Sequence, residues 1–221
     1  MTVLTATALG FAGALAGIPV AAVAYSTSTT GPVRLPARWW AGGPAPTAVV
    51  LVTATATGIA AAIIGAAVPP TLTLPAFWLF AVLGTGLAII DARYRRLPHQ
   101  LTGALWASSG LCFALAAISG EGMARLLRAA GAGAATATVL LVVALILSGQ
   151  LGLGDVVLAG AVTLNLGWLS IQGAVVGLLA GLVLQGVAAI AIRLWRTIDA
   201  LTPMGPALFV GWLLGIVYAT R

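Results

Sequence analysis

The residues best suited to chemistry in this chain are two aspartates, each placed at the edge of an apolar run. The sequence has only four acidic residues. Asp91 ends one apolar span, and Asp155 follows Gly152 and Gly154 at the start of another. An ionisable side chain at or inside a membrane boundary is costly, so its presence there indicates a functional role. The two glycines let backbone approach Asp155 closely.

Two carboxylates at a shared, partly dry site cannot easily both ionise, so we expect one of them to hold a proton at neutral pH. The ionised carboxylate can take a proton from water as a general base, while the protonated one donates to a peptide carbonyl as it becomes a tetrahedral oxyanion. Aspartic proteases divide the work in this way, without a metal or a cofactor. The sequence leaves open which aspartate is the base. The simpler alternative is that each aspartate only caps a helix beside arginines.

These aspartates lie in a chain with the composition of a membrane protein. Of its 221 residues 61% are hydrophobic and 6% are charged, and the mean hydropathy is +1.13, whereas soluble domains carry about 25% charged residues. We predict an all-α polytopic membrane protein, a bundle of about eight transmembrane helices (six to eight). The apolar spans cover residues 3–25, 47–69, 74–91, 100–118, 129–148, 156–168, 171–192 and 206–220.

The charged and sulfur-containing residues exclude several other classes. The net charge is +6, and all the basic residues are arginines, most of them in short loops. Such arginines are expected as topology signals, so no nucleic-acid partner is implied. The single Cys112 excludes a disulfide framework or a cysteine-pair zinc site within one chain.

The chain divides into an N-terminal transmembrane helix plus a short cytoplasmic loop, residues 1–45, and a multi-spanning core, residues 46–221. The first ten residues contain no basic residue, which the leading region of a signal peptide should have, so we expect the first helix to be retained. An external N-terminus places most arginines in the cytoplasm, as the positive-inside rule requires. The arginines on that side are Arg34, Arg38, Arg93, Arg95, Arg96, Arg193 and Arg196.

The number of crossings between the two aspartates predicts that they share a side of the membrane. Two spans, residues 100–118 and 129–148, separate Asp91 from Asp155. An even number of crossings returns the chain to the side it left, so both carboxylates are expected at the cytoplasmic boundary. Glu121 falls on the opposite side, and Asp199 lies in a polar loop where an ion pair or a cap is expected.

Other features are interpreted as structural. The glycine ridges Gly173, Gly177 and Gly181, and Gly13 with Gly17, are typical of close helix packing in lipid. Trp168 is expected as an interfacial anchor, together with two other tryptophans. Arg125 and Arg128 fall on the external side and are expected to snorkel from the start of the fifth span.

Three motifs together resemble those of the bacterial type IV prepilin peptidases. Residues 91–102 (DARYRRLPHQLT) are similar to the first active-site motif of that family. Residues 152–158 (GLGDVVL) are similar to the second, the Gly-x-Gly-Asp signature shared with presenilin-like intramembrane proteases. Residues 202–208 (TPMGPAL) resemble the Gly-Pro start of the last helix. The resemblance covers roughly residues 45–221.

The resemblance implies a membrane aspartyl endopeptidase that cuts the leader from prepilins or pseudopilins at the cytoplasmic face of the bacterial plasma membrane. Asp91 and Asp155 would be the catalytic pair. Gly152 and Gly154 would allow close approach to Asp155, and Pro98 would end the turn after Asp91. The implied partners are the prepilin substrate and the lipid bilayer; the oligomeric state and the particular prepilin are not implied.

The chain departs from the family pattern at three places. Val157 stands where many members carry a lysine, and His99 occupies a position that is often Asp or Asn. The loop from Ser26 to Pro46 lacks the cysteine-rich insert of the long members, so we expect no zinc, no S-adenosylmethionine and no N-methyltransferase activity. The alternatives left open are a non-catalytic homologue in a pilus or secretion assembly and, with less support, a small transporter.

Overall fold

The computed structural model describes residues 2–27, 33, 35–146, 152–195 and 202–221. Within these residues it contains eight α-helices and no strand, and six of the helices are long and apolar enough to cross a membrane. The predicted all-α membrane bundle is therefore confirmed. The helices are α1 (Thr2–Ser26), α2 (Thr47–Ala67), α3 (Leu74–Tyr94), α4 (His99–Ala116), α5 (Met123–Ile146), α6 (Leu153–Leu169), α7 (Ile171–Trp195) and α8 (Gly205–Ala219).

Two short helical segments complete the described secondary structure. A 3-10 turn, Trp39–Ala41, follows the first helix, and a π-helical turn, Ala117–Glu121, continues α4. Gly120 within that turn has a φ of 101°, a left-handed conformation that glycine adopts without strain. The chain turns there into α5.

The helix ends differ from the predicted spans in two places that matter for the site. Helix α3 continues to Tyr94, so Asp91 lies inside its last turn rather than at its end. Helix α5 begins at Met123 rather than at residue 129, so Arg125 and Arg128 belong to its first turns. Hydropathy marks the apolar part of a helix, whereas the helix itself continues through polar residues as far as hydrogen bonds and caps allow.

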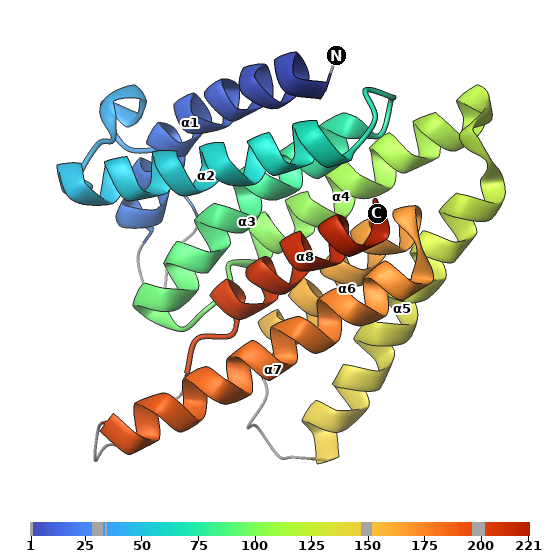
Figure 1. Cartoon of the computed structure of the whole chain (residues 1–221). Helices are drawn as coiled ribbons and strands as arrows, with labels where there is room; N and C mark the ends of the chain where they lie inside the picture. The colour runs from blue at the N-terminus through green and yellow to red at the C-terminus, as the bar shows by residue number, and fades with distance from the viewer. Residues whose placement is uncertain (1, 28–32, 34, 147–151, 196–201) are drawn as a thin grey trace.

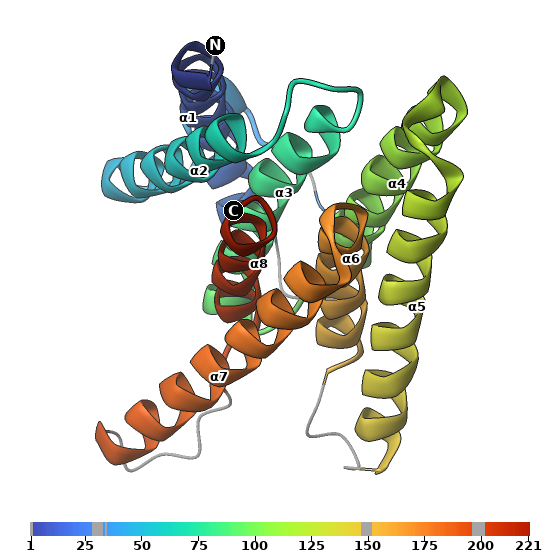
Figure 2. The same cartoon turned by 45° about the vertical axis from the view of Figure 1, so that its right-hand side comes forward.

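The helices form three antiparallel neighbour pairs, α1 with α2, α5 with α6, and α7 with α8. Helices α4 and α8 each contact both α3 and α6, so they join the two helices that carry Asp91 and Asp155 (Figure 1). The lower halves of α5 and α7 diverge on either side of α6 (Figure 2). The aspartate-bearing helices are thus held in the middle of the molecule.

The glycine ridges pack as predicted. A Cβ added to Gly177 would clash with the Leu166 side chain and lie 3.0 Å from the Gly211 carbonyl oxygen, and Gly181 likewise faces α8. On the first helix pair, a Cβ on Gly13 would lie 2.5 Å from Ala61. Glycine at these positions lets the helix backbones approach more closely than any side chain would permit.

The core between α3, α4, α6 and α8 is aromatic, with a buried polar link. Phe80 stacks on Trp212 at 4.5 Å between ring centroids, and Phe113 stacks on Trp168 at 4.7 Å. Trp168 is only 3% exposed, so it is a core residue and not the interfacial anchor that the sequence suggested. Asn165, also fully buried, joins three helices: it donates to the Ser109 hydroxyl at 3.1 Å and accepts from Trp212 Nε1 at 2.8 Å.

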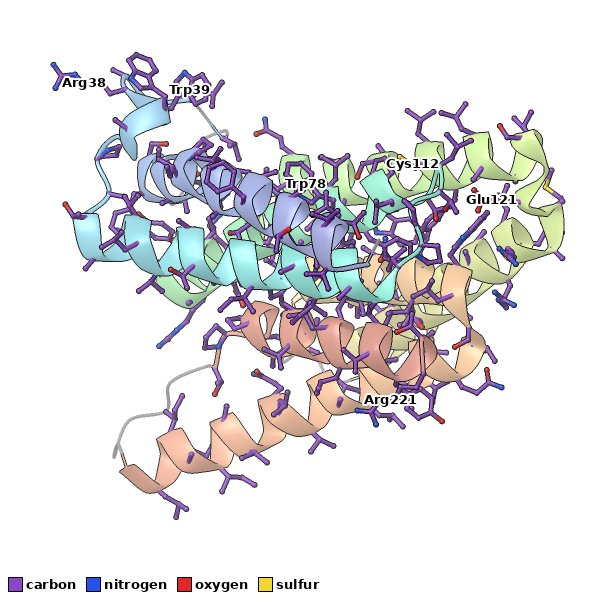
Figure 3. The ribbon with its side chains drawn as sticks, turned by 45° about the horizontal axis from the view of Figure 1, so that its top comes forward. Arg38, Trp39, Trp78, Cys112, Glu121 and Arg221 are labelled. Carbon is purple, nitrogen blue, oxygen red and sulfur yellow. The ribbon has the colours of Figure 1, made fainter. Side chains whose placement is uncertain are left out.

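Glu121 lies far from the aspartates. It stands at the opposite end of the α4 segment from His99, a separation of about 33 Å at the rise of a helix. Figure 3 shows it at the end of the bundle away from Arg38 and Trp39 of the first loop. Asp199 falls outside the described residues.

Arg128 has a defined structural role at the α6 terminus. Its guanidinium donates to the carbonyl oxygens of Gly167 at 2.8 Å, Trp168 at 2.6 Å and Leu169 at 3.1 Å. The last carbonyls of a helix have no partner within the helix and carry partial negative charge, so a cationic fork is well matched to them. Arg128 therefore caps α6 from the first turns of α5 instead of only reaching for the membrane surface.

Replacing Arg128 by alanine leaves these three carbonyl oxygens without their donor. We expect Arg128→Ala to lower the free energy of unfolding by about 2 kcal/mol, measured by denaturant titration in detergent micelles. Arg125→Ala is the matched control, because it removes the same charge from an exposed position on the same helix. Equal decreases of the free energy of unfolding in the two variants would show that the charge stabilises the fold and that the hydrogen bonds of Arg128 to α6 do not.

Candidate active site

The two aspartates predicted to act together line one cavity. This cavity has a volume of about 290 Å³. Its walls come from the end of α3, the connection into α4 and the start of α6. The lining residues are Asp91, Arg95, Arg96, Leu97, His99, Gly152, Gly154 and Asp155. Two carboxylates therefore face one polar space at an end of the helix bundle.

Asp91 is held by the first residues of α8. Asp91 is 4% exposed, and its carboxylate accepts a hydrogen bond from the Gly205 backbone N–H at 2.6 Å; the Met204 backbone N–H also donates to it. The first N–H groups of a helix lack partners within the helix and carry partial positive charge. Asp91 thus caps α8 across the bundle, and α8 supplies the hydrogen bonds that a buried carboxylate requires.

The close contact between α3 and α8 depends on Gly205. A Cβ at this position would lie 3.1 Å from Asp91 Cβ and 3.1 Å from its Oδ2, tighter than ordinary side-chain contacts. Pro206 follows at the second position of the helix, where the missing N–H of proline is harmless and its fixed φ favours the helical conformation. The Gly-Pro sequence therefore lets the N-terminus of α8 approach the carboxylate.

Asp155 occupies the third position of α6 and is half-buried. Its carboxylate accepts a hydrogen bond from the Gly152 backbone N–H, the group that precedes the first turn. A side chain at the third helical position often returns to the N-cap in this way. A Cβ on Gly152 would lie 3.0 Å from Asp155 Oδ2, so glycine leaves room for this turn.

Gly154 lines the cavity, and Pro98 lies between two lining residues, Leu97 and His99. A Cβ on Gly154 would meet Leu97 Cβ at 2.9 Å, so this glycine lets the start of α6 pack against the α3–α4 connection. Pro98 is buried and caps α4: its carbonyl oxygen accepts from the backbone N–H groups of Leu101 and Thr102. The turn after Asp91 ends there because α4 begins.

The arginines after Asp91 divide into two groups. Arg95 and Arg96 line the cavity, together with the exposed His99. Arg93 instead lies over the Tyr25 ring, 3.4 Å from its centroid, and so ties α3 to the end of α1. Arg95 has a φ of 52°, and its backbone N–H donates to the Asp91 carbonyl oxygen at 2.8 Å, which closes α3 one turn after the carboxylate.

This arrangement can perform general acid–base chemistry. Two carboxylates that share a cavity disfavour the doubly ionised state, so a single proton can be divided between them. No group of three or more potential metal ligands occurs among the residues that the structure describes. Val157, at the position where many members of the resembled family have lysine, uses its backbone carbonyl oxygen to accept from Trp106 Nε1 at 3.0 Å, a link between α6 and α4.

Sequence reasoning missed the backbone donors to Asp91. The third motif drew attention to Gly205, but its spacing from Asp91 is 114 positions, and no local periodicity connects the two. The signal that was available is the Gly-Pro pair itself, which marks a helix start where other backbone can come close.

The chain was compared with known proteins. A family model described as the type IV leader peptidase family matches residues 78–219, which include both aspartates, the three motifs and helices α4 to α8. No curated protein and no solved structure matches the chain. The match extends over more than half of the chain, from the second turn of α3 to the end of α8, and the chain therefore belongs to the type IV leader peptidase family.

Proposed function

We propose that the protein is a membrane aspartyl endopeptidase that removes the leader from prepilin-like proteins at the cytoplasmic face of the bacterial plasma membrane. The observation that carries this proposal is the cavity in which Asp91 and Asp155 meet, within the part of the chain matched by the family model. Each carboxylate is held by backbone N–H groups at a helix start. Such bonds fix a catalytic group in place before substrate arrives.

The proposed reaction needs only the two carboxylates and a water molecule. The ionised aspartate takes a proton from a water molecule while the water oxygen attacks the scissile carbonyl carbon. The protonated aspartate donates its proton to the carbonyl oxygen. In the tetrahedral intermediate that results, the carbon–nitrogen bond then breaks. The amine leaves with the proton taken from water, while the second carboxylate recovers its proton from the intermediate's hydroxyl. The pair returns to its starting state.

The charges support a cytoplasmic cavity. Arg95 and Arg96 line it, and Arg93 lies in the last turn of α3, two positions before Arg95. Arginines near the ends of spans face the cytoplasm by preference. Arg128, on the opposite side, bonds to helix carbonyls and so has a structural reason to be there.

The sequence and the family also support proposals about the substrate and the cofactors. The substrate is proposed to be a prepilin or pseudopilin whose cleavage site reaches the cavity from the bilayer. The short first loop and the single cysteine lead us to propose peptidase activity without N-methylation, without zinc and without nucleic acid. A non-catalytic relative within a pilus assembly is the competing function, and the first test separates the two.

The first test is leader cleavage in membranes that contain the protein and candidate prepilins from the same genome, followed by mass spectrometry. We expect wild type to cleave, and Asp91→Asn and Asp155→Asn each to reduce kcat by about 10³-fold or more, because each removes one of two obligatory proton carriers. Glu121→Gln is the matched control, since it neutralises an acid at the far end of α4 and should cleave normally.

Cleavage that survives either aspartate substitution would disprove the pair mechanism. A well-inserted wild type that cleaves none of the candidates would favour the non-catalytic relative.

A second prediction concerns the contact between Gly205 and Asp91. In Gly205→Ala the new methyl group would lie 3.1 Å from the carboxylate oxygen, so the carboxylate must move, and we expect kcat to fall about 100-fold. Gly110→Ala is the control, because nothing lies within 4 Å of the added Cβ. Wild-type turnover by Gly205→Ala would show that this contact does not position Asp91.

A further inference from the structure

Helix α7 carries a buried polar atom that the reaction described above does not use. The C-terminal half of α7 is lined by exposed apolar side chains, including Val183, Leu184, Val187 and Ile190. Gln185 lies among them, within the most hydropathic of the candidate spans. An amide in this setting loses its hydration, and it is tolerated only where it gains hydrogen bonds in return.

The Gln185 amide bonds to the segment that leads into α8. Its Nε2 donates to the Thr202 backbone carbonyl oxygen at 2.9 Å. Its Oε1 is buried and has no donor among the residues that the structure describes. A leucine at this position would carry no such unmet acceptor, so side-chain packing does not explain the glutamine. The bond to Thr202 is what the amide contributes.

Thr202 lies three positions before Gly205, whose N–H bonds Asp91. The intervening segment is stiff, because Pro203 has a fixed φ and confines Thr202 to extended conformations, and α8 begins only two residues after Pro203. A shift of Thr202 is therefore passed along the backbone to Met204 and Gly205. These two residues donate the backbone hydrogen bonds that hold the Asp91 carboxylate.

We propose that Gln185 is a positioning residue for the aspartate site: it fixes Thr202 and, through the proline-stiffened segment, the N–H groups that hold Asp91. This role rests on the proposed peptidase function for its effect on turnover. Its effect on the placement of Asp91 is independent of that function. Helix α7 thereby takes part in the site although it supplies no residue to the cavity lining.

The test variant is Gln185→Met, which keeps the length of the side chain and removes the amide. In leader cleavage we expect kcat to fall about 10- to 100-fold, with KM changed less than about 3-fold, because the carboxylate is misplaced while substrate binding is retained. Leu184→Met is the matched control, since it changes a neighbouring exposed side chain of the same helix. The thermal midpoint in detergent is measured for every variant.

A double-mutant cycle separates positioning from general loosening of the fold. Gln185→Met and Gly205→Ala both disturb the contact between Asp91 and the start of α8. The fold-reduction of kcat in the double variant should therefore be much smaller than the product of the two single fold-reductions. Multiplicative losses, an unchanged kcat, or a raised KM with normal kcat would each overturn the proposal.

A readout without substrate keeps this inference distinct from the proposed function. A hydrophobic carbodiimide labels carboxyl groups in membranes. Mass spectrometry of the peptide that contains Asp91 then gives the rate at which this carboxyl group is labelled. We expect labelling to rise about 3-fold or more in Gln185→Met and to stay unchanged in Leu184→Met. Increased labelling supports the positioning role even if wild type cleaves no prepilin, in which case the peptidase proposal alone fails. Unchanged labelling in a cleaving enzyme overturns the positioning role and leaves the peptidase proposal standing.

Discussion

A carboxylate buried in a membrane protein is stable only where the protein supplies its hydrogen bonds, and for Asp91 the donors are backbone N–H groups at the start of α8. This contact joins α3 to α8, which lie 114 positions apart at the bonded residues. It requires a glycine at position 205, because a side chain there would occupy the space of the carboxylate. The position of α8 and the position of the Asp91 carboxylate therefore depend on each other, and much of the remaining structure holds α8 in place.

Helix α8 is held in position from three sides. Glycines on α7 and α8 bring those backbones together, and the Phe80–Trp212 stack joins α8 to α3. The buried Asn165 then bonds both Trp212 and Ser109, which links α8 and α6 to α4. Polar bonds of this kind are worth making inside a bilayer because lipid offers no competing partner. They fix the helices that bear the aspartates relative to one another.

The capping interpretation and the catalytic interpretation of the aspartates are compatible in this fold. Asp91 does cap a helix, but the helix is α8 rather than its own, and Asp155 bonds the N–H that precedes α6. A helix start offers donors of fixed direction, so it holds a carboxylate without neutralising it by a countercharge. The same bonds that satisfy each group also fix its position at the cavity.

Much of this could be predicted from the sequence, and the rest could not for identifiable reasons. Apolar runs predicted eight helices because lipid imposes both composition and length, and the count of crossings anticipated that Asp91 and Asp155 would share one end. The direction of individual side chains was not predictable: Arg93 turns to Tyr25 while Arg95 and Arg96 line the cavity. By position alone, Trp168 and Arg128 resemble residues at the membrane boundary. In the structure Trp168 stacks on Phe113 in the core, and Arg128 donates hydrogen bonds to the last carbonyls of α6. Such contacts depend on distant segments that no local pattern records.

Cross-linking in native membranes shows whether Asp91 and Asp155 face each other across one cavity. In a Cys112→Ala background, Asp91→Cys is combined with Asp155→Cys, and a short bifunctional thiol reagent is added. We expect efficient cross-linking of this pair and none between Glu121→Cys and Asp155→Cys. Failure of the first pair to cross-link, although each single cysteine reacts with a monofunctional reagent, would contradict this arrangement of the two aspartates.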